Sequence, residues 1–371
     1  MKLLHTADLH IGAELSYLDN LAESRKYEVL QVFRNICGLC KKENVEFCLI
    51  AGDLFDSNAA AATFAEPVLR YIAETKDTHF LYVAGNHDPL DSASPFKSLE
   101  LPGNLTVFGE EYETAEFPEF KVRAMGRSFS HSSMEFVVPP AMPQDNFINL
   151  MLLHADFGAP GSRYNPITTD FVKDCGADYL ALGHIHKRTA VEQIGNTHLS
   201  YCGCPEGQGF DEAGEKGVYV GILNKDGCRL HFAPCSNRLH ISEKFDLSDA
   251  KSTDDAERII LDALLFECGE HYDRNLYKII LTGSPENLHD INIPELLSRL
   301  KAKLYFVKVK NRLKPRLDLE LLSKEISLKG LFVNRMLDKI KTADEGDKKK
   351  FIDALYLGLD AFDGEVAYDE D

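Results

Sequence analysis

This 371-residue sequence lacks several features, and their absence limits the classes of protein to which it can belong. No run of apolar residues approaches the roughly 18 that a membrane-spanning helix needs, and no apolar stretch precedes His5-Thr6-Ala7-Asp8. Basic charge is scarce too, because 59 acidic residues outnumber 41 basic ones and give a net charge of -18. We therefore expect a cytoplasmic protein that makes no use of a membrane. The charge disfavours a nucleic-acid substrate without excluding one, since local Lys/Arg clusters or bound metal ions can still attract DNA.

A pattern typical of disulfides is also missing. The nine cysteines are odd in number and scattered from Cys37 to Cys268, which suits free buried thiols. Cys37-x-x-Cys40 lies in a helix-like stretch, residues 27–42, and no second Cys/His pair follows it at zinc-finger spacing. We predict that these thiols are structural.

The composition that is present, 44% hydrophobic and 27% charged, is that of an ordinary globular protein. A single core usually stops growing at roughly 250 to 300 residues, so the chain length predicts a large domain plus something smaller. No internal repeat at a period of roughly 20 to 50 residues is visible.

Short apolar runs that end in polar loop residues predict buried strands at residues 2–6, 47–51, 80–84, 148–154 and 179–182. Helix-length segments, residues 22–42 and 61–76, separate the first three strands, and this β-α-β-α-β order is typical of an α/β sheet with covered faces. Residues 107–147 form shorter pieces broken by Pro and Ser, and residues 191–232 have the pattern of hairpin strands. A second, more antiparallel sheet is therefore expected.

The periodicity restarts after residue 238. Strands are predicted at residues 239–245, 276–282 and 304–309, with helices at 254–268 and 293–301, which is enough for a small α+β domain. Two amphipathic helices follow, and the acidic tail, residues 363–371, is expected to be disordered. The apolar positions of the two helices are Ile326, Phe332, Val333, Met336, Leu337 and Ile340, then Phe351, Ile352, Leu355, Tyr356 and Leu359.

Polar clusters lie at or just after the carboxyl ends of five predicted strands. Ligands of open α/β sheets bind at those ends, so clusters that are distant in the sequence can converge there. Glycines at positions 52, 85 and 183 allow tight turns or close approach of the backbone. The clusters are Asp8-Leu9-His10, Gly52-Asp53-Leu54-Phe55-Asp56, Gly85-Asn86-His87-Asp88, His154 and Gly183-His184-Ile185-His186.

These residue types suit a pair of divalent metal ions. Two ions roughly 3.5 to 4 Å apart can clamp a phosphate, activate a water and stabilise the leaving oxygen, and they need a bridging carboxylate with imidazole and oxygen ligands. The set contains no thiolate, which favours Mn, Fe or Zn over a thiolate-rich zinc or iron-sulfur site. The predicted ligands are Asp8, His10, Asp53, Asn86, His154, His184 and His186.

Each cluster has a simpler interpretation when taken alone. A D-x-H or G-D-x-x-D turn is often a polar cap on a strand end, and a single histidine such as His154 is more often a hydrogen-bonded core residue than a ligand. The order and placement of all five clusters favour the metal site, because chance rarely puts every one of them at a strand end.

In this order the motifs resemble the calcineurin-like metallophosphoesterase superfamily, and within it the SbcD-like DNA-repair nucleases and their bacterial YhaO-type branch. The resemblance is strong over residues 1–223. With the patterns above, it implies a four-layer α/β/β/α sandwich (residues 1–237), a small α+β capping domain (238–316) and a helical C-terminal segment with an acidic tail (317–371). The motifs are His5-Thr6-Ala7-Asp8-Leu9-His10-Ile11-Gly12, Asp178-Tyr179-Leu180-Ala181-Leu182-Gly183-His184-Ile185-His186-Lys187 and Gly214-Glu215-Lys216-Gly217.

The resemblance also implies a role for each site residue. His87 would be the catalytic residue that protonates the leaving oxygen, and Asp56 would orient it. Many nucleases of the family carry His at the position of Asp56, which puts the pairing of Asp56 with His87 in question. Asp88 is favoured as a turn-capping carboxylate. One ion would be held by Asp8, His10 and His186 and the other by Asn86, His154 and His184, with Asp53 bridging both.

Two basic regions are candidate DNA contacts. Lys187 and Arg188 follow the last ligand and either touch a DNA backbone or are solvated surface. Within residues 301–316, the alternation of Lys308, Lys310 and Arg312 suits a phosphate-contacting strip, or equally an edge strand protected by lysines. The alternatives remain open for both regions.

The leading hypothesis implied by the resemblance is an Mn-dependent DNA exo- or endonuclease that acts as one component of a DNA-repair complex with an SbcC-like coiled-coil ATPase. Fe and Zn are the alternatives to Mn, the C-terminal helices are the predicted ATPase contact, and a homodimer is a further partner prediction. A second hypothesis is a phosphodiesterase or phosphatase for small molecules or phosphoproteins, which the acidic charge favours. A third, an inactive scaffold, is disfavoured because every expected ligand position is filled.

Overall fold

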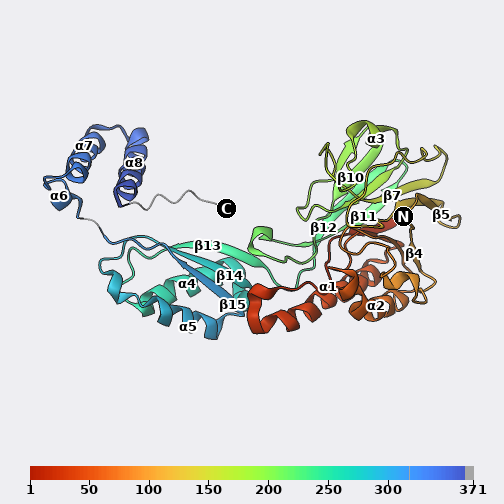
Figure 1. Cartoon of the computed structure of the whole chain (residues 1–371), viewed down its shortest axis with the longest axis horizontal. Coiled ribbons are helices and arrows are strands. Elements are labelled where there is room, and N and C mark those ends of the chain that lie inside the picture. Colours follow the sequence, from red (N-terminus) through yellow and green to blue (C-terminus); the bar gives the residue numbers. More distant parts are fainter. Residues whose placement is uncertain (317, 364–371) are drawn as a thin grey trace. The chain divides into compact units, whose positions relative to one another are not determined.

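The computed structural model describes residues 1–316 and 318–363 (Figure 1), so residues 364–371 of the predicted acidic tail lie outside the described residues. The chain divides into two compact units. The first comprises residues 1–242, 271–278 and 304–307, and the second comprises residues 243–270, 279–303 and 308–371. The predicted domain limits at residues 237 and 316 stay a prediction.

The first unit contains a six-stranded sheet in the order β12-β11-β1-β2-β3-β4. The strands β1 to β4 are parallel, and the β11-β12 hairpin joins the sheet antiparallel to β1. The strand bounds are β1 (Lys2–Thr6), β2 (Phe47–Ala51), β3 (His79–Val83), β4 (Leu105–Val107), β11 (Gly217–Asn224) and β12 (Gly227–Pro234). The apolar runs at residues 2–6 and 47–51 therefore form the strands that were predicted from them.

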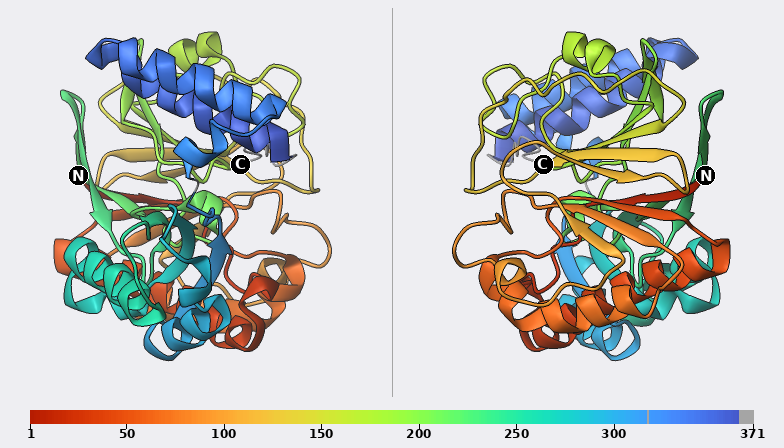
Figure 2. Two further views of the ribbon diagram at one scale, coloured as in Figure 1. Left: turned by 90° about the vertical axis from the view of Figure 1, so that its left-hand side faces the viewer. Right: turned by 90° about the vertical axis from the view of Figure 1, so that its right-hand side faces the viewer.

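Two helices cover one face of this sheet (Figure 2), namely α1 (Ala22–Glu43) and α2 (Asn58–Ala73). Phe33 of α1 and Val68 of α2 pack in the same core as Ile50 and Tyr82, which lie at alternate positions of their strands. Ser57 caps α2, because its hydroxyl accepts a hydrogen bond from the Ala60 N–H.

All nine cysteines are free, as predicted. Cys37 and Cys40 lie on the buried face of α1, in the same core as Cys48 of β2. Burial raises the pKa of Cys37 and of Cys48 well above that of an ordinary thiol, so these side chains are neutral. Neutral buried thiols fit the predicted structural role.

A second six-stranded sheet, in the order β5-β6-β7-β8-β10-β9, completes the sandwich. Leu49 and Leu81 of the first sheet pack against Leu150, Leu152 and Ala181 of the second, and α3 (Thr169–Asp174) lies over the outer face. This four-layer α/β/β/α architecture confirms the predicted fold class. The strand bounds are β5 (Glu113–Phe117), β6 (Val122–Arg127), β7 (Ile148–His154), β8 (Tyr179–Gly183), β9 (Glu192–Ile194) and β10 (Thr197–Tyr201).

The second sheet differs from the expected antiparallel one. Its central strands β6, β7, β8 and β10 are parallel, and only the edge strands β5 and β9 run antiparallel to their neighbours. The connection from β6 to β7, residues 128–147, contains no helix, so the usual sequence signal of a parallel crossover is absent. Two hairpins form in the region predicted to contain hairpin strands, residues 191–232: β9-β10 lies at the edge of the second sheet, whereas β11-β12 belongs to the first.

A third sheet has the order β13-β14-β15, with β13 (His240–Asp246), β14 (Leu276–Thr282) and β15 (Phe306–Asn311). The helices α4 (Thr253–Cys268) and α5 (Ile293–Lys303) contact each other and lie along one side of it (Figure 1). These are the helices and strands of the predicted α+β region. Lys308 and Lys310 are both exposed on β15, which is an edge strand, so the edge-protection and phosphate-strip hypotheses both remain compatible with its position.

The C-terminal helices are α6 (Leu319–Leu322), α7 (Leu328–Thr342) and α8 (Glu345–Asp363). Val333 of α7 packs with Leu355 and Leu359 of α8, and the two long helices lie side by side (Figure 1). Within the described ranges, no helix has the length and apolar character needed to cross a membrane. Short 3-10 helices are η1 (Ser16–Leu21), η2 (Pro95–Lys97), η3 (Phe210–Glu212), η4 (Gly269–Arg274) and η5 (Leu288–Asp290).

His240 should make the first unit sensitive to acid. The Tyr17 hydroxyl lies 2.6 Å from its Nε2, the side chain is buried, and burial lowers its pKa to about 4. Because the unfolded chain takes up this proton near the ordinary pKa of 6.5, it binds more protons than the native state between pH 6.5 and 4. Stability is therefore lost as the pH falls through that window, by about 2 kcal/mol between pH 7 and pH 5.

We expect the variant His240→Gln to lose this share of the pH dependence. Urea unfolding at pH 7 and at pH 5 measures it, as the difference between the wild type and the variant. Equal pH dependence of the two proteins would show that His240 is not the acid-sensitive group.

Candidate metal centre

The predicted ligands come from loops that follow five strands of the two sheets. Asp8 and His10 follow β1, Asp53 follows β2 and Asn86 follows β3, whereas the second sheet supplies the rest. His154 ends β7, and His184 and His186 follow β8. Within each of the two sheets these strands are parallel, so their carboxyl ends meet at one edge of that sheet. The structure brings all seven side chains together at the two edges.

The backbone at this edge is held in a rarely populated conformation. Asp8, His10, Asp53 and His184 have positive φ values of 53°, 48°, 48° and 100°. Such φ values cost non-glycine residues free energy and persist where surrounding contacts enforce them, often at functional sites. Here the Asp8 N–H donates to the Gly52 carbonyl and the His10 N–H to the Asp53 carbonyl, both at 3.0 Å. The first two loops thus hold one another in place.

The three glycines allow the close approach that was expected of them. A Cβ on Gly52 would lie 2.2 Å from Nδ1 of His154, one on Gly85 would lie 2.1 Å from Oδ1 of Asp53, and one on Gly183 would lie 1.9 Å from the Ala51 carbonyl oxygen. Any side chain at these positions would displace a predicted ligand or a neighbouring strand.

Gly85→Ala tests this crowding. We expect it to destabilise the fold by roughly 2 kcal/mol or more and to weaken metal binding, because the new methyl group would push the Asp53 carboxylate away. Gly38→Ala is the matched control, since that exposed glycine of α1 has no atom within 4 Å of an added Cβ, and it should stabilise the protein by about 0.5 to 1 kcal/mol. Thermal unfolding and a metal titration measure both effects. Equal behaviour of the two variants would contradict the crowding at Gly85.

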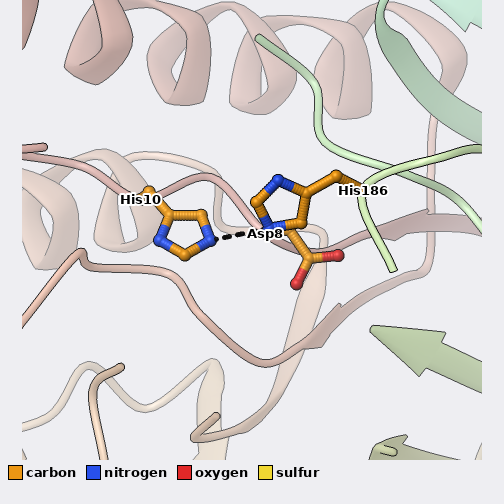
Figure 3. Close-up of side chains that lie close together, drawn as sticks. All are labelled: Asp8, His10 and His186. Atoms are coloured by element: carbon orange, nitrogen blue, oxygen red, sulfur yellow. Dashed lines mark hydrogen bonds between the residues drawn. The ribbon is translucent and has the colours of Figure 1, made fainter. Parts of the chain in front are cut away.

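Asp8, His10 and His186 form one half of the cluster (Figure 3). Nε2 of His10 lies 3.1 Å from Nε2 of His186 and 3.7 Å from Oδ2 of Asp53. His186 Nδ1 donates to the Glu212 carboxylate, so in the neutral ring the lone pair of Nε2 faces His10. Nitrogen and oxygen donors therefore converge on one point.

Asn86, His154 and His184 form the other half. His154 Nδ1 donates to the Ala51 carbonyl at 3.0 Å, and its Nε2 lies 3.0 Å from Asn86 Oδ1 and 3.3 Å from Asp53 Oδ2. The ring centroids of His154 and His184 are 5.1 Å apart. The backbone N–H of His184 donates to Asp8 Oδ1 at 2.9 Å, which links the two halves.

This donor set fits metal ions because it lacks any other cation. Asp8 and Asp53 are buried, with 0% and 2% of their surfaces exposed, and imidazoles are their only basic partners among the described residues. Buried carboxylates are costly unless a positive charge compensates them. In the neutral ring, the lone pair of His154 Nε2 also faces Asn86 Oδ1 and Asp53 Oδ2, an arrangement that a bound cation would stabilise.

The pKa shifts follow from this crowding. Burial disfavours a charge on His154, but the Asp53 and Asp8 carboxylates outweigh it and raise its pKa to about 9. Burial also opposes ionisation of Asp53, yet His154 and His10 hold its pKa well below the ordinary range. Burial raises the pKa of Asp8 and lowers that of His184 to about 4. The carboxylates thus favour a positive charge between His154 and Asp53, which is the charge that a bound metal ion would supply.

His87 and Asp56 lie beside the cluster. The His87 N–H donates to Asp53 Oδ1 at 2.9 Å, and its imidazole, 46% exposed, faces solvent. Nδ1 of His87 donates to the backbone carbonyl of Asp56 at 3.1 Å, whereas the Asp56 carboxylate is 3.9 Å away and lies nearer to Nδ1 of His10, at 3.3 Å. His87 therefore makes its hydrogen bond to the main chain of Asp56, while the Asp56 carboxylate lies at the outer limit of ion-pair distance. The orienting role of Asp56 stays a prediction.

Asp88 has the capping role that was favoured for it. Its buried carboxylate accepts hydrogen bonds from the N–H groups of Gly85 and Phe55 and from the Tyr82 hydroxyl. These bonds shape the turn that carries Asn86 and His87.

Two carboxylates that contact predicted ligands were missed. Glu212 accepts a hydrogen bond from His186, and Oδ1 of Asp156 lies 3.4 Å from Nε2 of His184. Asp156 comes two residues after His154, so its place just beyond a strand end was the available signal. Glu212 follows no strand end and lies 26 residues from His186 in the chain, so no spacing pointed to it.

The neighbouring basic residues line a small pocket beside His186. Lys187, Arg188 and Lys216 border a cavity of about 170 Å³. The Arg188 guanidinium lies 3.7 Å over the Phe232 ring, which fixes its direction.

A four-layer sandwich with this mixed carboxylate, amide and imidazole cluster at the carboxyl ends of its strands defines a metallophosphoesterase. The chain belongs to the calcineurin-like phosphoesterase family, whose sequence model matches residues 1–188. The resemblance seen in the motifs is thereby confirmed.

Several described relatives are similar to this chain. The "Uncharacterized metallophosphoesterase YhaO" of Bacillus subtilis is 26% identical over 267 residues, which is 68% of this chain and 64% of the relative. The SbcD component of the nuclease SbcCD of Escherichia coli K12 is 23% identical over 279 residues, covering 62% of this chain and 66% of the relative. The "DNA double-strand break repair protein Mre11" of Methanopyrus kandleri is 25% identical, covering 59% and 52%. The chain thus spans between about half and two thirds of the length of these relatives.

Proposed function

We propose that this chain is a metal-dependent DNA nuclease that hydrolyses phosphodiester bonds at a dinuclear centre, with Mn as its ion. The observation that carries the proposal is the gathering of six nitrogen- and oxygen-donor side chains, with His87 beside them, around the buried Asp53. The similarity to proteins named for nuclease activity and for repair of DNA breaks supports DNA as the substrate over other phosphodiesters.

In this proposal Asp8, His10 and His186 would hold one ion, Asn86, His154 and His184 would hold the other, and Asp53 would contact both. Two bound divalent ions supply charge stabilisation for the phosphate and a water that ionises near neutral pH.

His87 supplies the proton for the leaving oxygen. Because its Nδ1 donates to the Asp56 carbonyl, the remaining nitrogen, Nε2, is the one that delivers this proton. The hydrogen bond from the His87 N–H to Asp53 keeps this acid next to the bridging carboxylate. Asp56 acts as a positioning residue through its carbonyl oxygen.

The pocket beside His186 is the proposed contact for the DNA backbone. Lys187 is exposed there and Lys216 lies on the same cavity wall, and both are close to a proposed metal ligand. We expect Lys187→Ala and Lys216→Ala each to lower the salt slope of duplex binding by roughly 0.9, as the loss of one phosphate contact would. Lys225→Ala is the matched control. Lys225 lies in the β11-β12 turn, near the end of β1 that is opposite the metal centre, and it pairs with Asp178.

Fluorescence anisotropy with a labelled duplex and chelated metal, measured at several salt concentrations, gives these slopes. A slope that stays unchanged in both pocket variants would remove this pocket from the DNA contact.

A coiled-coil ATPase like SbcC is the proposed partner, acting with the chain in cytoplasmic DNA repair. The C-terminal helices are the proposed contact, and they belong to the segment beyond residue 316 that we propose as a separate region. Leu328 and Leu331 of α7 are exposed, as is Ile326 just before it, and they suit a helix-in-groove contact. Co-purification with the ATPase should be lost on deletion of residues 319–371. A truncated chain that still binds the ATPase would refute this contact.

A phosphodiesterase for small molecules is the second candidate, favoured by the net charge of -18. An Mn-dependent assay on single-stranded DNA, double-stranded DNA and a cyclic nucleotide separates the two. We expect DNA cleavage, whereas turnover of the cyclic nucleotide without DNA cleavage would reverse the assignment.

A further inference from the structure

Glu212 binds the nitrogen of His186 that faces away from the cluster. One carboxylate oxygen, Oε1, accepts the hydrogen bond from His186 Nδ1. This leaves Nε2 of His186 as the nitrogen that lies 3.1 Å from His10 Nε2, inside the proposed metal centre. Glu212 thereby sets which nitrogen of His186 carries the proton.

The other oxygen of Glu212 is also held. Oε2 accepts a hydrogen bond from the Gln208 N–H at 2.7 Å and one from the Cys204 thiol at 3.5 Å. The Glu212 side chain is only 14% exposed. A carboxylate with three donors in a half-buried position has a defined direction, unlike a surface glutamate that samples several rotamers.

The turn that carries Glu212 is itself anchored. Glu212 ends η3, in which the Phe210 ring contacts the rings of Tyr17, His240 and Phe306. The loop opposite is fixed too, because the Cys204 N–H donates to the His186 carbonyl at 3.2 Å, and a Cβ on Gly203 would lie 2.7 Å from that oxygen. His186 is therefore held by the main chain on one side and by Glu212 on the other.

We propose that Glu212 is a positioning residue for the metal centre, which orients His186 and fixes the tautomer in which Nε2 is free to bind a divalent cation. The inference rests on the proposed metal centre. Carboxylates that accept a hydrogen bond from a metal-binding imidazole raise its basicity, and their loss typically costs roughly 10- to 100-fold in metal affinity. Without Glu212, the ring can place a proton on Nε2, where it blocks the bond to the metal.

The test compares Mn²⁺ binding to the full-length chain in three variants. Glu212→Ala removes the acceptor, Glu212→Gln keeps a neutral acceptor of the same size, and Asp211→Ala removes a carboxylate from the same turn without touching His186. Isothermal titration gives the affinity and stoichiometry, and the ¹⁵N chemical shifts of His186 in the metal-free protein report its tautomer.

We expect Glu212→Ala to weaken one of the two Mn²⁺ sites by roughly 10- to 100-fold and to shift the His186 tautomer. Glu212→Gln should weaken it less, and Asp211→Ala should match the wild type. Wild-type affinity and an unchanged His186 tautomer in both Glu212 variants would overturn the proposal. If Glu212→Ala does not fold, the Gln variant alone decides. Wild-type protein that binds two Mn²⁺ ions but leaves DNA intact would refute the nuclease function and not the role of Glu212.

Discussion

Replacing Asp53 by asparagine is expected to lower hydrolysis roughly 1,000-fold or more and to reduce the bound metal from two ions to one or fewer per chain. Asp53 is the only residue proposed to contact both ions. It is buried, and its Oδ2 lies 3.3 Å from His154 Nε2 and 3.7 Å from His10 Nε2, so it faces both halves of the cluster. An amide has nearly the same shape but supplies no negative charge to hold two cations close together.

Asp145→Asn provides the control for this variant. Asp145 is a carboxylate outside the cluster that pairs with Arg123, so its loss should leave metal content and turnover unchanged. Metal analysis of the purified proteins and turnover of a phosphodiester measure both quantities. Two tightly bound ions in Asp53→Asn would show that Asp53 is not the bridge.

The second large effect is expected from His87→Asn, which should lower turnover roughly 100- to 10,000-fold while two metal ions stay bound. Lower turnover with unchanged metal content distinguishes a general acid from a metal ligand. His87 lies near His10 and Asp53, so a ligand role is geometrically available to it, but its Nδ1 already donates to the Asp56 carbonyl. Loss of metal from this variant would assign His87 to the ligands instead.

The choice of substrate sharpens this test. A phosphodiester with a p-nitrophenolate leaving group needs no protonation, so His87→Asn should retain most of the wild-type activity on it and lose activity on DNA. His131→Asn, at an exposed histidine outside the cluster, should be unaffected on both substrates. An equal loss of activity of His87→Asn on the two substrates would contradict the role of His87 as general acid.

The first sheet could be predicted from the sequence because its strands carry a strong local signal. Residues 2–6 and 47–51 are apolar runs with both faces covered, each is followed by a loop with a ligand, and one helix of the expected length, α1, separates them. The same logic located His154 and His184 at strand ends. Within each sheet, convergence of the ligands follows from its parallel strands, and the two sets meet because the two sheets pack together.

The parts of the fold and of the site that were not predicted depend on contacts that leave no local pattern in the sequence. The parallel order of the second sheet was not predicted, because residues 128–147 cross over without a helix. Spacing placed Asp56 near His87 but could not tell that its carbonyl oxygen lies nearer to His87 Nδ1 than its carboxylate does. Glu212 reaches His186 through a turn whose position depends on packing of Phe210, which no periodicity of the sequence encodes.

Anomalous scattering from a crystal of the Mn²⁺-loaded protein tests the central claim most directly. The account predicts two manganese peaks on opposite sides of the Asp53 carboxylate, one beside Asp8, His10 and His186 and the other beside Asn86, His154 and His184. A single peak, or peaks that do not share Asp53, would contradict it.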